Sequence, residues 1–192
     1  LEGIGDVHWF KYQEDDALSY YQRSLKLNET LNNKTGIGFQ LQNLGYLYLE
    51  RKEYSKALDY HIKALKIKED IEDTIGVGLA FHAIAAVFIA LRDLDLALDY
   101  EKKGQKIIEE MGTEIAKSYI YRRLGIIYEH IGDYDEAFRY YLLEFNILTK
   151  IGEQWPVGSS NFRMGKIYFL MSDYDKAIQH LTESLNIQSE IR

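Results

Sequence analysis

The residues best suited to acid–base chemistry or metal binding in this chain are five histidines, scattered along its 192 residues. They do not form a close set with aspartate or glutamate on one helical turn, as a metal site would need. Glu129 and His130 are adjacent, so their side chains would point to different faces of a helix. We therefore expect no metal site, no cofactor and no general base among His8, His61, His82, His130 and His180.

Other catalytic signatures are also missing from the sequence. The chain has no cysteine, which excludes disulfides, thiol catalysis and thiolate metal ligands. The stretches 36–38 and 76–78 resemble fragments of a phosphate-binding loop, but no strand precedes them and each opens a repeated helix. No nucleophile elbow is present. We therefore predict that the chain is not an enzyme.

The charge balance is acidic, with 30 Asp and Glu against 23 Lys and Arg and a formal net charge of −7. No basic block interrupts it, so we predict no binding to nucleic acid or to anionic membranes. We also expect no apolar run of the roughly 18 residues that span a bilayer. The absence of cysteine fits a reducing, cytoplasmic location. Because the chain begins at Leu1, partway into a predicted helix, we expect it to be a segment of a longer protein.

Small residues recur along the chain with a fixed period of 40 residues. One column holds alanine in all five copies, and a second column, twelve positions earlier, holds glycine in four copies. A period of this length indicates a repeat architecture. The alanines are Ala17, Ala57, Ala97, Ala137 and Ala177, and the second column is Gly5, Gly45, Ala85, Gly125 and Gly165.

Two amphipathic segments fill each period, and in the second repeat they cover about residues 37–51 and 54–71. The chain has a single proline, Pro156, and no strand signal, so we predict an all-α protein. We expect an α-solenoid of five antiparallel helix pairs, in which the first helix of the first pair is truncated. The array is predicted to be a single domain over residues 1–192, with repeats at about 1–33, 34–73, 74–113, 114–153 and 154–192.

The helix ends can be predicted from local chemistry. Asp73 and Thr113 are plausible helix N-caps, whereas Gly112 and Gly152 are expected to end helices in the left-handed conformation. Glycine inside a helix costs about 1 kcal/mol relative to alanine, so the glycine column needs a packing reason. We expect each glycine to lie against the alanine of the second helix.

One pattern of aromatic and small residues returns in each repeat. In the second repeat it consists of Leu44, Gly45, Tyr48, Tyr54, Ala57, Leu58, Tyr60, Ala64, Leu65 and Ile67. This pattern resembles the tetratricopeptide repeat, and the period of 40 is similar to the lengthened repeats of kinesin light chains, Pins-type adaptors and bacterial signalling proteins. The resemblance implies a right-handed superhelix whose first helices line a concave groove. The third repeat departs most, with Ala85, Leu94 and Gly104.

The resemblance places a binding surface on the face of the first helices that neither packing column uses. This face is rich in apolar residues, and an exposed apolar strip generally marks an interaction site. Its basic residues fall mainly in the last two repeats, so we predict a peptide or helix with apolar anchors and an acidic end there. The alternative is that its aromatic residues pack against one another or against a helix outside this chain. The predicted peptide-binding residues are Phe39, Gln42, Tyr46, Leu49, Leu79, His82, Ile89, Tyr119, Arg122, Arg123, Ile126, His130, Phe162, Arg163, Lys166 and Phe169.

The partner is expected to be another protein. Chaperone-binding members of the family grip a terminal carboxylate with two lysines, two asparagines and an arginine, and no register of three repeats in this chain supplies that set. We predict a protein–protein interaction scaffold. The alternative is a regulatory or oligomerisation domain of a larger signalling protein, such as a sensor kinase or a nucleotide cyclase. The last helix, from Tyr174, has no polar capping helix after it, which favours self-association.

Overall fold

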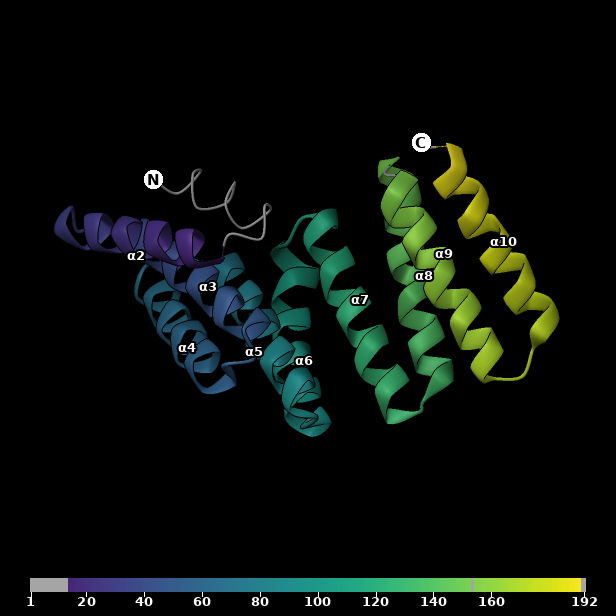
Figure 1. Cartoon of the computed structure of the whole chain (residues 1–192). Coiled ribbons are helices and arrows are strands. Elements are labelled where there is room, and N and C mark those ends of the chain that lie inside the picture. Colours follow the sequence, from purple (N-terminus) through teal and green to yellow (C-terminus); the bar gives the residue numbers. More distant parts are fainter. Residues whose placement is uncertain (1–13, 153, 191–192) are drawn as a thin grey trace. The chain divides into compact units, whose positions relative to one another are not determined.

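The computed structural model describes residues 14–152 and 154–190. Within them the chain forms nine α-helices and no strand, joined by short turns so that successive helices run antiparallel (Figure 1). The predicted all-α solenoid of helix pairs is confirmed, while the truncated first helix lies outside the described residues. The helices are α2 (Glu14–Thr30), α3 (Lys34–Glu50), α4 (Tyr54–Asp70), α5 (Thr74–Leu91), α6 (Leu94–Met111), α7 (Glu114–Ile131), α8 (Tyr134–Ile151), α9 (Gln154–Leu170) and α10 (Tyr174–Glu190).

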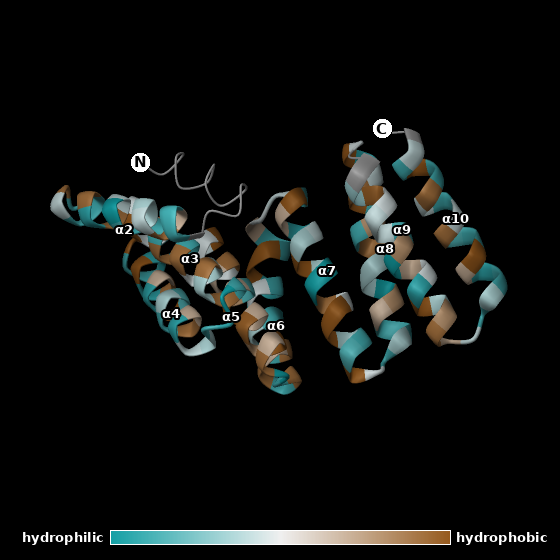
Figure 2. Ribbon diagram, viewed as in Figure 1, coloured by the Kyte–Doolittle hydropathy of each residue, from teal (hydrophilic) through white to brown (hydrophobic). Residues whose placement is uncertain are grey.

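The chain divides into two compact units, one extending to Gly104 and the other beginning at Gln105. In the N-terminal unit α3 packs against α2, α4 and α5, and α4 packs against α5. In the C-terminal unit each helix from α7 to α10 packs against the next one along the chain (Figure 1). Polar and apolar residues interleave along these helices, as expected for helices that bury one face (Figure 2). Each unit has its own buried clusters of aromatic and aliphatic side chains.

Most turns between helices contain one residue in the left-handed conformation. In the turn after α5, the backbone N–H groups of Arg92 and Asp93 donate to the carbonyls of Ile89 and Phe88, which satisfies acceptors that the helix end leaves open. Gly152 takes the same conformation, as predicted, with φ of 85°. The left-handed residues are Asn32, Lys52, Glu72, Arg92, Gly132, Gly152 and Ser172, which follow one another at multiples of 20 positions.

The predicted N-caps are confirmed, and one predicted C-cap is wrong. The side chain of Asp73 accepts a hydrogen bond from the Gly76 backbone N–H, and Thr113 accepts one from Ala116. Gly112, in contrast, is not among the left-handed residues. The extended backbone of Thr113, with ψ of 160°, redirects the chain there and makes a left-handed glycine unnecessary.

At Gly45 and Gly125 the nearest neighbours are aromatic rings and not the column alanines that were expected, whereas Gly165 lies close to the Leu181 side chain and, as expected, to the backbone carbonyl of Ala177. A methyl group added at Gly45 would lie 2.4 Å from the His61 ring, and one added at Gly125 would lie 2.5 Å from the Tyr141 ring. Both rings belong to the second helix of the same repeat, four positions after the buried alanine. Glycine is therefore required because a large side chain is seated directly on the backbone of the first helix.

Helix α5 corrects the expectation about apolar runs. Its 18 residues, Thr74–Leu91, have a mean hydropathy of 2.2 and are long and apolar enough to cross a membrane, the one such helix among the described residues. Half of this stretch is buried within the protein, because α5 packs against α3 and α4. Its buried positions are mostly small, including Gly76, Gly78, Ala80 and Ala83. An apolar helix of this kind is what the interior of a helical stack requires.

Candidate functional site

In the N-terminal unit, most predicted binding residues are packed within the protein. The Tyr46 ring lies edge-on to the His61 ring, with 4.9 Å between their centroids. Leu49 packs on the buried cluster of Tyr48, Ala57 and Val87. Leu79 and Ile89 are half-buried. Phe39 of α3 is the predicted anchor of this unit that remains largely exposed, at 48%.

The two polar residues predicted for this surface are also engaged. Gln42 accepts a hydrogen bond from the Nζ of Lys68, a largely buried lysine of α4. His82 of α5 has its Nδ1 2.7 Å from an Oε1 atom of Glu101, whose side chain is completely buried. These side chains hold neighbouring helices together, so they are poorly placed to recognise a partner.

Two further polar side chains of the N-terminal unit, Gln40 and His61, are fully buried with no hydrogen-bond partner among the described residues. Burial lowers the pKa of His61 to about 4, with smaller contributions from the positive charges of Lys68 and His82. No three His, Cys, Asp or Glu side chains lie close enough to hold a metal ion within the part of the chain that the structure describes.

The C-terminal unit contains a buried carboxylate that sequence reasoning missed. Glu144 of α8 has a side chain only 1% exposed, and its Oε1 lies 2.9 Å from Nη2 of Arg163 on α9. The same oxygen lies 3.5 Å from Nε of Arg122 on α7, and Oε2 accepts a hydrogen bond from the Ser160 hydroxyl. Burial raises the pKa of Glu144, while the two arginines oppose that rise. One carboxylate thus connects three consecutive helices.

A second carboxylate connects the same three helices. Oε1 of Glu129 on α7 lies 2.6 Å from Nζ of Lys166 on α9, and its Oε2 accepts a hydrogen bond of 2.9 Å from the Tyr141 hydroxyl on α8. Burial raises the pKa of Tyr141, and the Glu129 carboxylate adds to this effect. Arg163 and Lys166, predicted to contact an acidic partner, are therefore already paired within the protein.

The sequence did hold a signal for Glu144. The equivalent positions of the other repeats carry Ser24, Ala64, Gly104 and Ser184. A column of small buried residues with one glutamate indicates a buried charge, and a buried charge requires a cationic partner nearby.

Several predicted residues of the C-terminal unit do remain accessible. Tyr119 of α7 is 45% exposed, and Phe162 and Phe169 of α9 are 52% and 58% exposed. The Phe169 ring contacts the Tyr174 ring, with 5.7 Å between centroids, whereas Phe162 has no ring contact within residues 14–152 and 154–190. Of the remaining predictions, Arg123 and Ile126 are half-buried and His130 is exposed.

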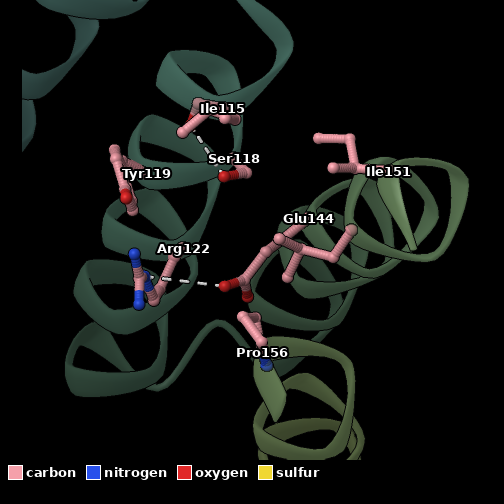
Figure 3. A pocket seen from close by; sticks show the side chains of 8 residues that line it. Ile115, Ser118, Tyr119, Arg122, Glu144, Ile151 and Pro156 are labelled. Atoms are coloured by element: carbon pink, nitrogen blue, oxygen red, sulfur yellow. Dashed lines mark hydrogen bonds and ion pairs between the residues drawn. The ribbon is translucent and has the colours of Figure 1, made fainter. Parts of the chain in front are cut away.

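A pocket of about 270 Å³ opens beside this accessible surface. Figure 3 shows Tyr119 and Arg122 of α7 on one side of it, Glu144 and Ile151 of α8 on another, and Pro156 of α9 at its lower edge. Pro156 is compatible with a helix here because it lies in the first turn of α9, where a backbone N–H has no partner within the helix. The full lining is Ile115, Ser118, Tyr119, Arg122, Glu144, Leu148, Ile151 and Pro156.

Comparison with solved structures supports the fold described above. No curated protein matches the sequence. The structure is similar to BtubC (BKLC) from P. vanneervenii, with 19% identity and a TM-score of 0.84 over 97% of this chain and 78% of that one. It is also similar to a Rap protein complexed with competence and sporulation factor, with 18% identity and a TM-score of 0.86 over 97% of this chain and 52% of that one.

A third similar structure is that of putative kinesin light chain repeats from Podosopora anserina, with 13% identity and a TM-score of 0.77 over 99% of this chain and 93% of that one. At such identities these likenesses show the fold alone. The family is shown by the sequence itself, because the model of the tetratricopeptide repeat matches residues 1–70, 37–110 and 115–190. The chain belongs to the tetratricopeptide repeat family.

Proposed function

We propose that this chain is a non-enzymatic protein-interaction scaffold that binds a peptide or an amphipathic helix on the exposed face of its first helices. The repeat family supports an interaction scaffold in general. A Rap protein of similar fold was solved in complex with competence and sporulation factor, which supports a peptide or protein as the kind of partner.

The observation that carries the proposal is the exposure of large aromatic side chains on neighbouring first helices of the C-terminal unit. Tyr119 lies on α7 and Phe162 on α9, and the ion pair between Glu129 and Lys166 joins these two helices directly. Full burial of such a side chain contributes about 1.5–3 kcal/mol, so covering a half-exposed ring contributes about 1 kcal/mol. A few anchors of this kind, placed centrally, supply much of the affinity of a typical interface.

The ion pairs limit which cationic side chains of this surface can contact the proposed acidic end of the partner. Arg163 is held by the buried Glu144 carboxylate and contributes mainly to the folded structure, whereas Lys166 is half exposed in its ion pair with Glu129. Reversing the charge of Arg163 would place a second carboxylate beside Glu144 and would test folding, not binding. Arg122, whose contact with Glu144 is longer at 3.5 Å, is the cation of this face best suited to meet an acidic group.

The proposal can be tested with a pool of random synthetic peptides captured on the immobilised chain and identified by mass spectrometry. Selected peptides would then be titrated by calorimetry against the wild type and the variants Phe162→Glu and Phe39→Glu. Matched controls are Leu142→Glu and Ile62→Glu, exposed apolar residues on the second helices α8 and α4.

We expect at least one of the first-helix variants to weaken binding by roughly tenfold, as the loss of about 1.4 kcal/mol would produce. The controls should bind as the wild type does. Selected peptides whose binding is unchanged by Phe162→Glu and Phe39→Glu, but weakened by a control variant, would place the binding surface elsewhere and refute the proposal.

A second candidate function, self-association as part of a larger signalling protein, is favoured by the outer face of α10. Ile178 and Leu185 are 64% and 66% exposed, whereas their counterparts Leu58 and Phe145 are half-buried. Analytical ultracentrifugation of the wild type and an Ile178→Asp/Leu185→Asp variant tests this candidate. A concentration-dependent dimer that the variant abolishes supports it, and a monomer at all concentrations of the wild type counts against it.

A further inference from the structure

The outward face of α10 lacks the charges that the other second helices carry at the same positions. Four exposed outward positions recur in each second helix, and charged residues occupy two of them in α2, three in α4, four in α6, one in α8 and none in α10. In α10 these positions are Gln179, Thr182, Asn186 and Ser189, and in α6 they are Asp99, Lys102, Lys106 and Glu109. Depletion of charged residues is typical of the core of a protein interface.

An apolar stripe runs along the same face. Tyr174, Ile178 and Leu185 are 56%, 64% and 66% exposed, and their spacing of four and seven residues places them on one side of the helix. On α8 the corresponding stripe is covered by α9, with 4.8 Å between the ring centroids of Phe138 and Tyr168. Helix α10 packs against α9 through a different side, at the end of the C-terminal unit (Figure 1). Its own stripe therefore remains available to a partner.

The area of this face is sufficient for a weak dimer. A large side chain presents about 200 Å², so the exposed parts of Tyr174, Ile178 and Leu185 together offer roughly 350 Å² of mainly apolar surface. Two such faces contribute about 700 Å², and the four neutral residues beside them bring the total above the roughly 1,000 Å² that a specific interface needs. An interface near this lower limit predicts a dimer that forms at micromolar or higher chain concentrations.

We propose that the outward face of α10 packs antiparallel against the same face of a second copy of this chain, about a two-fold axis that passes between Leu181 and Thr182. Ile178 and Leu185 lie equally far from this axis along the helix, so each Ile178 meets Leu185 of the second copy. An isologous contact of this kind closes on itself and gives a dimer. The inference rests on the second candidate function, self-association, and specifies its surface and geometry.

The polar residues at the edge of the face also match one another in this arrangement. Gln179 comes to the level of Asn186 of the second copy, where two side-chain amides can exchange hydrogen bonds. Asp175 comes to the level of Ser189 of the second copy, so no carboxylate faces another carboxylate. A parallel pair would instead bring both Asp175 side chains to one level, which like-charge repulsion disfavours. A helix that presented charges to the four neutral positions would find no ion-pair partner there, so this face favours a copy of itself.

Disulfide trapping tests the arrangement, because the chain has no cysteine of its own. A disulfide requires the two Cα atoms to lie within about 7 Å of each other. The full chain would be made as Thr182→Cys, as Thr182→Cys with Ile178→Asp, and as the control Leu142→Cys, the corresponding exposed position of α8. Each is oxidised with copper phenanthroline, and the disulfide-linked dimer is followed over time by non-reducing electrophoresis.

We expect Thr182→Cys to form the linked dimer faster than Leu142→Cys by roughly tenfold or more, because a complex holds its two thiols at an effective concentration far above that of the free chains. Adding Ile178→Asp should reduce the rate to that of the control. Since Ile178 is an exposed residue, this variant should keep the circular dichroism spectrum of the wild type.

A mixture of Gln179→Cys and Asn186→Cys chains, distinguished by mass, tests the direction of the two helices. An antiparallel pair should give almost only the mixed disulfide, because each of these positions lies at the level of the other. Random collision would also give both of the like-paired dimers.

A Thr182→Cys chain that is linked no faster than Leu142→Cys, a rate unchanged by Ile178→Asp, or a random set of products from the mixture would each overturn the inference. These results are separable from a failure of self-association itself. A wild type that sediments as a monomer at all concentrations would refute both. A dimer that Ile178→Asp/Leu185→Asp abolishes, but that gives none of these disulfides, would refute the antiparallel arrangement alone.

Discussion

Lowering the pH should destabilise the N-terminal unit through His61. This side chain is completely buried on α4, both of its ring nitrogens lack a partner among the described residues, and its pKa is lowered from 6.5 to about 4. Between these two values the unfolded chain binds a proton that the folded chain does not bind. Proton binding therefore favours unfolding, and the stability present above pH 6.5 is lost as the pH falls toward 4.

The size of the effect follows from the shift. Each pKa unit corresponds to about 1.36 kcal/mol, so a fall to about pH 5, roughly 1.5 units below the unfolded pKa, costs about 2 kcal/mol. The burial of His61 is complete, so solvent screening does not reduce this figure appreciably. A loss of this size is a substantial fraction of the total stability of a small domain.

The assay is urea unfolding, followed by circular dichroism at about pH 7 and about pH 5, of the wild type and of His61→Leu. Leucine is a suitable replacement because Leu181 occupies the equivalent position opposite Gly165. The wild type should lose about 2 kcal/mol more than the variant between the two conditions, and the ring protons of His61 should titrate near pH 4. An equal loss in both proteins, or a His61 titration near pH 6.5, would refute the reasoning.

Three further predictions concern packing, turns and the buried ion pair, and thermal unfolding measures each of them. Gly125→Ala should destabilise the C-terminal unit by about 1–3 kcal/mol, because the added methyl group would lie 2.5 Å from the buried Tyr141 ring. A variant more stable than the wild type would contradict this packing. Lys52→Gly should stabilise the chain by about 0.5–1 kcal/mol, because Lys52 has φ of 60° and glycine adopts that conformation without strain. A melting temperature of the variant below that of the wild type would argue against backbone strain at this turn. Arg163→Met should cost about 3–5 kcal/mol, because it leaves the buried Glu144 carboxylate with only the longer Arg122 contact and the Ser160 hydrogen bond. Adding Glu144→Ala should restore much of that loss, and a double variant no more stable than the single one would contradict the ion-pair account.

The parts of the structure that the sequence predicted are those set by local chemistry. The period of 40, the helix pairs and the caps at Asp73 and Thr113 depend on residues a few positions apart, so spacing alone reveals them. Phe39 and Phe162 are exposed, as the binding-surface prediction requires.

The parts that the sequence did not predict depend on contacts between helices. Arg163 pairs with a carboxylate 19 positions away and Lys166 with one 37 positions away. Long side chains can reach any of several neighbours, and the partner depends on how the helices stack, which spacing does not specify. The partner of Gly45 was missed for a similar reason, because the depth to which the His61 ring inserts depends on the separation of the two helices.

The buried pair of Glu144 and Arg163 has a consequence for the order of the repeats. At the two positions involved, the repeats are not equivalent: Ala83 corresponds to Arg163, and Ala64 corresponds to Glu144. Exchanging α9 for α3, which has Gly45 in the glycine column, would keep that column intact, yet it would set Asn43 against a buried carboxylate. Helices that are interchangeable in shape are therefore distinguished by charge, and we expect chimaeras that preserve this pair to fold where shuffled ones do not.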